Sequence, residues 1–595
     1  MRTEKGLDGQ LLKRIVGYLM PYKHWVILAF CLVLVVSFLG PLRPWLISIA
    51  IDQHIVTGEL DGLYLLIYAL LGAIVLEGVL GYANAYFTQW IGQQAIYDVR
   101  VRVFRHVQKQ SLSFFDKTPI GRLITRTTSD VEALADVLSA GIVVIMGDMF
   151  KLLFIAAFMF SLNWVLAIVT LGVMPFMVLV TMWFKRNVRG QYRETRKQVA
   201  RLNSFMQEHV TGMLIVQLFG REKVEMKRFE HINDEHQTAQ LKTVFYHSIF
   251  WPAVDIIAST AIGFILWTGG VSAIGGALTV GVLIAFIQYC RQFFEPIRNL
   301  SEQFNTLQSA MAGAERIFDV LDHDQSLPDT NAQNPPTGFE GEIVFDDVWF
   351  AYKHLDDGTP DWVLRGVSFK IDRGQNAAIV GATGSGKTTI ISLLMRFYDI
   401  QKGQILIDGQ DIRTIRIKFL RWRIGLVLQD VFLFSGSVYR NIALDNPDIS
   451  LEQVKQAAQA IGAHQFIERL PGQYHHDVRE RGLSLSQGQR QLLSFVRVLA
   501  YDPDILVLDE ATSSIDTETE HMIQHALERV LQGRTSLVVA HRLSTIRHAD
   551  QILVLHKGVL REQGTHDDLV DSGGLYQTLY ELQYREQQLM MDRTE

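Results

Sequence analysis

The position of the long apolar segments constrains the fold of this chain more than any other feature of its sequence. Six apolar segments long enough to cross a bilayer, about 20 residues each, lie before residue 310, and none follows. Such segments are typical of membrane-spanning helices. The sequence therefore predicts a membrane domain over residues 24–320, with spans at about 24–49, 62–90, 138–160, 162–184, 248–270 and 277–300.

The connections between these segments alternate in length and charge. Residues 50–61, 161–163 and 269–277 are short and contain no Lys or Arg, whereas residues 91–137 and 185–247 are long and basic. Because Lys and Arg accumulate in cytoplasmic loops, the long connections and both termini are expected on the cytoplasmic side of the cytoplasmic (inner) membrane.

Apolar residues recur at helical spacing through both long connections, as in Val99, Val103 and Val107, so the spans are expected to continue as helices beyond the membrane. The helical pattern breaks at residues 117–121 and at Thr211–Gly212. A short transverse helix at each break could contact a cytoplasmic partner. Each connection could equally be an ordinary helical hairpin, and the pattern alone leaves both possibilities open.

Residues 1–23 precede the first span and predict an amphipathic elbow helix that lies on the inner leaflet. A removable signal peptide is not expected, because this segment has no short apolar core and no small-residue cleavage site. The apolar face of the expected helix consists of Leu11, Leu12, Ile15, Val16 and Leu19, opposite Lys13 and Arg14.

Several charged residues fall within the predicted spans. Because a charge that faces lipid is costly, such residues are expected to face a cavity or one another. Asp148 and Lys151 are three residues apart and could either pair on one helix face or contact a transported molecule. The residues singled out are Arg43, Glu77, Asp148, Lys151, Asp255 and Glu295.

The composition argues against several other classes of protein. A net charge of −6 gives no reason to expect nucleic-acid binding. The two cysteines, Cys31 and Cys290, both lie in apolar segments, so neither a disulfide framework nor a thiol–metal site is expected. A hydrophobic fraction of 48% fits a membrane half joined to a soluble half.

The pattern changes at residues 321–341, where Asp, Asn, Pro and Gly predominate, and this segment is predicted to be a linker. Beyond it, short β-rich runs alternate with helical stretches, which is typical of an α/β domain with a largely parallel sheet. We expect this domain to cover residues 342–580, followed by a C-terminal tail at 581–595.

A phosphate-binding loop opens this second domain. The apolar run 376–380 predicts a strand, and it leads into residues that fit G-x-x-x-x-G-K-[ST] and then into a helical stretch. In such a loop the backbone N–H groups wrap the phosphates, the lysine neutralises the outer phosphates and the hydroxyl that follows it can hold Mg²⁺. The residues expected to contact the nucleotide are Gly381, Ala382, Thr383, Gly384, Ser385, Gly386, Lys387, Thr388 and Thr389.

Two later strands end in residues suited to phosphate chemistry. The apolar run 505–508 is followed by Asp509 and Glu510, and the run 536–540 is followed by His541. Because ligands bind beyond the carboxyl ends of parallel strands, all three side chains are expected beside the phosphates. Asp509 would support Mg²⁺, Glu510 would act as the base for the attacking water and His541 would contact the γ-phosphate.

The segment Leu485-Ser486-Gln487-Gly488-Gln489-Arg490-Gln491 resembles the signature sequence of ABC transporters, and the resemblance covers nearly the whole chain. It implies that Ser486, Gln487, Gly488 and Gln489 cover the ATP bound by a partner subunit, that Tyr352 stacks on adenine and that Gln429 senses Mg²⁺. It further implies that Asp516 lies in the loop that crosses between subunits. Both Phe114-Phe115-Asp116 and Glu480-Arg481-Gly482 resemble the stretches through which exporters couple their ATPase to their membrane domain.

One position departs from the family pattern Leu-Ser-Gly-Gly-Gln, because Gln487 occupies the third place. A side chain there would crowd the nucleotide of the partner subunit, while this chain keeps Glu510. The combination resembles the subunit of heterodimeric bacterial multidrug exporters that retains the catalytic glutamate. The resemblance therefore implies a heterodimer with a related chain, with a homodimer as the alternative.

The function expected from these features is the ATP-driven export of amphiphilic drugs or lipids by alternating access, with ATP and Mg²⁺ as cofactors and a second exporter half as partner. An ATP-gated channel or regulator without pumping is the rival, and a peptide or a specific lipid is the alternative cargo. The rival is disfavoured because a gate does not need the hydrolytic residues Glu510 and His541.

Overall fold

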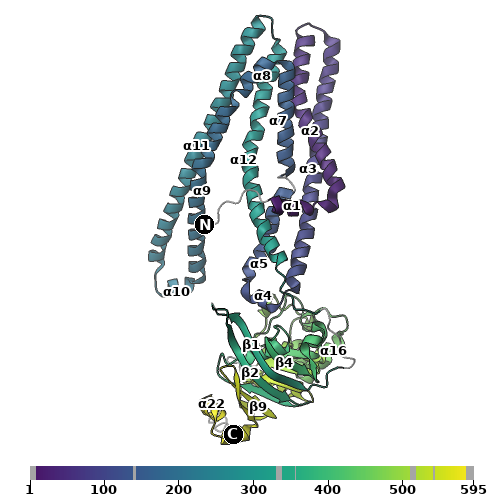
Figure 1. Cartoon of the computed structure of the whole chain (residues 1–595), viewed down its shortest axis with the longest axis vertical. Helices are drawn as coiled ribbons and strands as arrows, with labels where there is room; N and C mark the ends of the chain where they lie inside the picture. Colours follow the sequence, from purple (N-terminus) through teal and green to yellow (C-terminus); the bar gives the residue numbers. More distant parts are fainter. Residues whose placement is uncertain are drawn as a thin grey trace. The chain divides into compact units, whose positions relative to one another are not determined.

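The computed structural model describes residues 9–138, 142–329, 338–355, 357–509, 517–540 and 543–583. The chain divides into two compact units, coloured along the sequence in Figure 1. The first unit comprises Met1–Gln108 with Ile120–His323, and the second comprises Lys109–Pro119 with Asp324–Glu595. The first is helical and the second is α/β, so the predicted fold class is confirmed.

Long helices build the first unit. In the described part of the chain, five helical segments are long and apolar enough to cross a membrane, and Val280–Phe294 is a shorter apolar stretch at the start of α12. The elements are α1 (Gly9–Gly17), α2 (Lys23–Ile49), α3 (Leu60–Lys109), α5 (Ile120–Thr127), α6 (Ser129–Asp136), α7 (Ile142–Leu162), α8 (Trp164–Leu171), α9 (Met174–Thr211), α10 (Met213–Leu218), α11 (Glu222–Ile274) and α12 (Val280–Asp322). Several therefore continue far beyond the apolar stretch, as the sequence predicts.

Part of the predicted apolar face of the N-terminal helix α1 packs against other helices of the first unit, while Val16 is exposed. Ile15 is 1% exposed and belongs to a core that includes Val99 of α3 and Ile317 of α12. On the same helix, Arg14 donates hydrogen bonds of 2.7 and 2.8 Å to the two carboxylate oxygens of Asp322. Helix α1 is thus fastened to the last residue of α12.

Helices α9 and α11 form a long packed pair whose tip is the short helix α10 (Figure 1). At the base of this tip, His209 of α9 contacts two groups that can only accept hydrogen bonds. Its Nδ1 lies 2.8 Å from the carbonyl oxygen of Phe205, and its Nε2 lies 2.9 Å from a carboxylate oxygen of Glu225 on α11. Both ring nitrogens must therefore donate, so the contact requires the protonated imidazolium.

This contact should make the order of the hairpin tip depend on pH. The hydrogen bond to Glu225 and the Phe205 carbonyl raise the pKa of His209, and the same contact with His209, aided by Arg228, lowers the pKa of Glu225. The contact is therefore lost when pH rises through the raised pKa of His209, or falls through the lowered pKa of Glu225. Between those two limits it holds the tip.

We predict that hydrogen exchange of the α10 amides, corrected for its intrinsic pH dependence, shows less protection above the pKa of His209. In His209→Gln that pH dependence should disappear. The control is His231→Gln on α11, because His231 is largely exposed and its ion-pair contact among the described residues is with the neighbouring Glu235. The same pH profile in wild type and His209→Gln would contradict the role of this histidine.

Two sheets form the second unit. One is four-stranded and antiparallel in the order β2-β1-β4-β5, and the other is six-stranded in the order β10-β9-β3-β8-β7-β6, parallel except for β10. The strands are β1 (Ile343–His354), β2 (Pro360–Ile371), β3 (Asn376–Val380), β4 (Lys402–Ile407), β5 (Gln410–Asp411), β6 (Ile424–Val427), β7 (Ile505–Asp509), β8 (Thr535–Val539), β9 (Gln551–His556) and β10 (Val559–Gly564).

The central strands of the six-stranded sheet are buried on both faces, which explains why they read as continuous apolar runs rather than as alternating ones. One hydrophobic core lies on each face of this sheet. The helices of the unit are α4 (Leu112–Lys117), α13 (Lys387–Leu394), α14 (Ile417–Arg423), α15 (Val438–Ala443), α16 (Leu451–Ala460), α17 (His464–Glu468), α18 (Gln487–Tyr501), α19 (Thr517–Leu531), α20 (Leu543–Arg547), α21 (His566–Asp571) and α22 (Leu575–Gln583).

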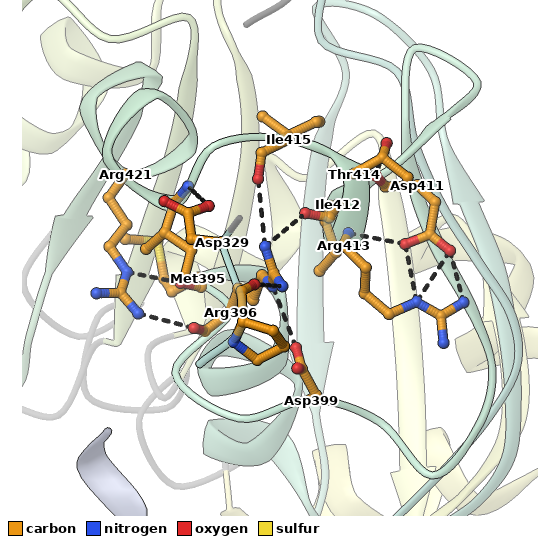
Figure 2. A network of polar contacts seen from close by, with 12 residues as sticks. Asp329, Met395, Arg396, Asp399, Asp411, Ile412, Arg413, Thr414, Ile415 and Arg421 are labelled. Atoms are coloured by element: carbon orange, nitrogen blue, oxygen red, sulfur yellow. Dashed lines mark hydrogen bonds and ion pairs between the residues drawn. The ribbon is translucent and has the colours of Figure 1, made fainter. Parts of the chain in front are cut away.

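A buried arginine fastens the segment 324–329 to this unit. Arg396, 1% exposed, donates to the Asp399 carboxylate at 3.1 Å and to the carbonyl oxygens of Ile415 and Pro328 at 3.2 and 2.8 Å. Figure 2 shows its guanidinium at the centre of these contacts. Asp329, which follows Pro328 in the chain, accepts a hydrogen bond of 3.1 Å from the backbone N–H of Ile417, the first residue of α14.

The same segment also pairs with the chain that leads into α4. The backbone N–H of Gln325 donates to the side-chain oxygen of Gln110 at 2.8 Å, and its carbonyl accepts from Ser111 N–H at 3.3 Å. Residues 324–329 are therefore held from two sides within the second unit. On one side are Gln110 and Ser111, and on the other is Arg396.

Candidate nucleotide-binding site

The carboxyl ends of four neighbouring parallel strands create the candidate site. Strand β3 pairs with β8, β8 pairs with β7, and β7 pairs with β6, all in parallel. The phosphate-binding loop follows β3, Asp509 ends β7 and Gln429 follows β6 closely in the chain. Residues that are far apart in the sequence thus meet at one edge of the sheet, where parallel α/β proteins bind ligands.

Glycines allow the phosphate-binding loop to follow its path. Gly384 and Gly386 have positive φ angles of 80° and 105°, which side chains other than glycine rarely adopt. At Gly381 a Cβ atom would lie 2.2 Å from the carbonyl oxygen of Leu555, so no larger residue fits. The loop then opens directly into α13, whose first N–H groups point toward any anion held there.

Lys387 provides the positive charge of this loop and is buried. Its side chain is only 8% exposed, and its ammonium donates to the carbonyl oxygens of Gly381 and Ala382 at 2.7 and 3.3 Å. Burial lowers the pKa of Lys387, and the nearby Asp509 carboxylate partly opposes that shift. A buried cation beside a wall of backbone amides is suited to a polyphosphate.

The hydroxyl-bearing residues in and just after the loop differ in how far they are exposed to solvent. Ser385 and Thr389 are buried, at 4% and 5%, and the Ser385 hydroxyl has no hydrogen-bond partner among the described residues. Thr383 and Thr388 are exposed. An unpaired buried hydroxyl in this loop costs folding free energy, which a phosphate oxygen within its reach would recover.

Tyr352 reaches the loop from the other sheet. It lies near the end of β1, and its hydroxyl donates to the Thr389 hydroxyl at 3.2 Å. Its ring is 38% exposed and packs edge-on against Phe350 and Tyr398, with centroids 4.7 and 5.1 Å apart. The ring is thus fixed beside the phosphate loop with part of its surface open.

The structure covers only part of the predicted catalytic set. Asp509 lies at the end of β7 and is partly buried, and Gln429 is exposed. The predicted residues Glu510, Asp516 and His541 lie outside the described residues. Their strands are in place, since β7 ends one residue before Glu510 and β8 ends two residues before His541.

The predicted signature residues begin helix α18. The Ser486 hydroxyl accepts a hydrogen bond from Gln489 N–H at 3.2 Å, and the Gln489 side chain accepts one from Ser486 N–H at 3.0 Å. This reciprocal capping fixes the first turn of the helix. Gln487 is exposed and Gly488 is buried, so the departing residue projects from the turn and does not disturb its packing.

Tyr398 is a functional candidate that the sequence reasoning missed. Its ring contacts Tyr352, and its hydroxyl donates to the Asp116 carboxylate of α4. Burial and the contact with Asp116 raise the pKa of Tyr398, so the phenol keeps its proton. This short chain of contacts joins the candidate adenine-binding ring to α4, and no sequence motif marks Tyr398.

Comparisons with known proteins give a consistent picture. The family model described as "ABC transporter transmembrane region" matches residues 26–297, and the one described as "ABC transporter" matches residues 364–513. The chain is 36% identical, over 98% of its own length and 96% of the relative's, to an uncharacterised ABC transporter ATP-binding protein, YknV, of Bacillus subtilis.

Two further relatives have more informative names. The ATP-dependent lipid A-core flippase of Desulfotalea psychrophila is 35% identical, with 96% of this chain and 99% of the flippase covered. YheH of Bacillus subtilis, named a probable multidrug resistance ABC transporter ATP-binding/permease protein, is 38% identical, with 88% of this chain and 77% of YheH covered. Similarity to each extends over both regions of the chain.

Proposed function

Because the chain belongs to the ABC transporter family, with its transmembrane and ATP-binding regions in one polypeptide, we propose that it is one half of a dimeric exporter of amphiphilic molecules. ATP hydrolysis drives the export of lipids or drugs. The observation that supports this most directly is the near full-length similarity to a lipid A-core flippase, together with the similarity to a multidrug-resistance protein. A gated channel or regulator is not favoured.

In this proposal each side chain of the ATP site has a distinct task. The backbone amides of the loop 381–386, the buried Ser385 hydroxyl and Lys387 bind the phosphates, while the Tyr352 ring stacks on adenine. Glu510 accepts a proton from the water whose oxygen attacks the γ-phosphorus, and the bond to the β-phosphate oxygen breaks. His541 holds the γ-phosphate, and Asp516 lies at the subunit boundary.

Mg²⁺ is part of the same proposal. The set Thr388, Gln429 and Asp509 offers hydroxyl, amide and carboxylate oxygens, which are the ligands that Mg²⁺ prefers alongside phosphates. When bound, the ion would neutralise phosphate charge as the γ-phosphoryl group departs. The fit rests on the chemistry of these donors and on the adjacency of β6 and β7 at this edge of the sheet.

The proposed location is the cytoplasmic membrane, with both termini and the ATPase region in the cytoplasm. The support is the concentration of Lys and Arg in the long connections and their absence from the short ones. In the predicted domain scheme, residues 1–23 form the elbow, 24–320 the membrane domain, 321–341 the linker, 342–580 the ATPase and 581–595 the tail.

Transport in sealed vesicles tests the function. Purified protein reconstituted with its partner should accumulate a fluorescent amphiphile against its gradient when ATP is outside, and ATP turnover should rise with the amphiphile. A channel would only equilibrate the probe. Uphill movement therefore separates the exporter from the gated rival, and ATP-dependent equilibration without accumulation would contradict export.

Tyr352 gives a specific test of the nucleotide pose. We predict that Tyr352→Ala weakens ATP binding by about 1 to 2 kcal/mol through the lost stacking. Tyr352→Phe should be nearly silent, because it keeps the ring and loses only a part-buried hydrogen bond to Thr389. Binding of a fluorescent ATP analogue measures both variants. Equal losses in the two variants would assign the effect to the hydroxyl and contradict stacking.

We further propose that the working unit is a heterodimer whose other chain has lost its catalytic glutamate. In a homodimer both composite sites would be covered by a signature with Gln487. Pairing with a chain that carries a full signature leaves one competent site, which uses Lys387 and Glu510 of this chain. The opposing view is that Ser486 and Gly488 supply the phosphate contacts, so that a homodimer works normally.

Co-expression distinguishes these assemblies. We expect this chain alone to give less than about a tenth of the ATPase activity of the complex with its partner, in line with loss of a transition-state contact. In a forced homodimer, Gln487→Gly should raise turnover, whereas in the heterodimer it should act mainly on the slow site. A stable and fully active self-dimer would overturn the heterodimer proposal.

A further inference from the structure

Helix α11 carries a charge that its packing does not explain. Asp255 is the only charged residue between positions 248 and 270, the part of α11 expected to cross the membrane. It lies seven residues inside the start of that stretch, which places it about 10 Å along the helix axis. A carboxylate at that depth is costly when it faces lipid.

The packing of α11 turns Asp255 away from the protein core. The buried positions Val254, Ala261 and Ile265 belong to the core that α11 shares with α8, α9 and α12. Asp255 and Ser259 lie on the other side of the helix and are exposed. Among the described residues, no hydrogen-bond or ion-pair partner of Asp255 is found.

Two other acidic residues of the spans, Glu77 and Asp148, have basic neighbours. Glu77 of α3 forms an ion pair of 3.0 Å with Arg43 of α2. Asp148 lies one helical turn from Lys151 on α7, and both make polar or electrostatic contacts. The side chain of Glu295 lies outside the described residues. Arg291 of α12 adds a positive charge to the spans, so what sets Asp255 apart is the lack of a basic partner among the described residues.

A shallow and widely open depression of about 510 Å³ lies along this face of α11 and is lined by Pro252, Asp255, Ile256, Ser259 and Thr260. Its polar groups are mainly acceptors. Thr260 donates its hydroxyl hydrogen to the carbonyl of Ile256 at 2.7 Å and so presents lone pairs. Pro252 has no N–H, so the carbonyl of Ser248 lacks its usual helical donor.

Acceptors and a negative charge beside Ile256 and Pro252 are complementary to a cation that carries apolar groups. We propose that Asp255 is a specificity-determining residue of the cargo path and that this exporter selects amphiphiles with a positive charge. This inference rests on the proposed export of amphiphiles and specifies its substrate class. The depression comes from α11 alone, so it forms one wall of the site.

Two ions of nearly equal shape and opposite charge test the inference. Equilibrium binding of tetraphenylphosphonium and tetraphenylborate is measured on the assembled transporter in nanodiscs. Wild type should bind the cation more tightly. Asp255→Asn should weaken cation binding about tenfold, as expected for loss of one partly screened charge contact, and should not weaken anion binding. Asp255→Glu keeps the charge and should restore most of the preference.

The matched control is Asp234→Asn, because Asp234 is an exposed carboxylate 21 residues earlier on the same helix, outside the apolar stretch. This variant should bind both ions like wild type. Unchanged cation binding in Asp255→Asn, or equal losses for both ions, would overturn the inference. The proposed export function would still stand if the vesicles transport a neutral dye. Dissociation of the dimer in Asp255→Asn would also overturn it, because Asp255 would then pair with the partner subunit. If wild type transports no amphiphile, the proposed function fails first.

Discussion

Replacement of Glu510 by glutamine is expected to slow ATP hydrolysis by about 10²-fold or more while ATP still binds. Glutamine has nearly the same size and keeps its hydrogen-bonding capacity, but it cannot accept the proton of the attacking water. The residue follows Asp509 at the end of β7, and β7 is separated from the phosphate-loop strand β3 only by β8. A base placed there is close to the outer phosphate.

Phosphate release by the assembled transporter measures turnover, and binding of a fluorescent ATP analogue confirms that the site is intact. The control is Glu528→Gln, the same substitution at an exposed position of α19. It should hydrolyse ATP like wild type. If Glu510→Gln turns over at a near-normal rate in a correctly assembled transporter, another group is the base.

Replacement of Arg396 by methionine is expected to destabilise the ATPase unit by about 3 kcal/mol or more, because it leaves buried polar partners without a donor. The methionine fills most of the volume, so the loss reports the polar contacts rather than a cavity. Asp399 and the carbonyl oxygens of Ile415 and Pro328 would all lose a donor. For a unit of this size the unfolding temperature should fall by about 6 to 12 °C.

Arg413→Met is a suitable comparison, because Arg413 pairs with Asp411 nearby, as Figure 2 shows, yet remains 43% exposed. An exposed ion pair contributes at most about 1 kcal/mol. Differential scanning fluorimetry of both variants at fixed nucleotide concentration gives the two shifts. Equal decreases in unfolding temperature for the two variants would mean that the buried contacts of Arg396 stabilise the unit no more than the exposed ion pair of Arg413.

Much of this architecture could be read from the sequence because its signals are local. The residues around Lys387 are contiguous, and the short helices lie next to the predicted breaks, since α4 ends at residue 117 and α10 begins at residue 213. The fold class and the ATP-binding region followed from such patterns. The assignments of Mg²⁺ ligands and of Glu510, His541 and Asp516 stay predictions, because they depend on a bound nucleotide or on residues outside the described part.

Other features could not be predicted because they depend on contacts between distant segments. Arg396 looks like an ordinary charged residue in the sequence, and only the folded chain shows that it is buried. The contact of Tyr398 with Asp116 joins residues 282 positions apart. The pairing of Arg43 with Glu77 likewise requires two helices to pack in a particular register.

The hydrogen bonds that fix residues 324–329 to the ATPase unit determine where the connection between the two units can be lengthened. Gln325 and Pro328 are already fixed within the ATPase unit by hydrogen bonds. Residues inserted between 330 and 337 would therefore leave the length of chain between the membrane domain and Gln325 unchanged. Such insertions should therefore be tolerated far better than an insertion between His323 and Asp324. That insertion would lengthen the connection between helix α12 and the first bonded residue, Gln325. A fragment meant to preserve the ATPase should accordingly begin at 324, since one that begins at 342 discards an acceptor of the buried arginine.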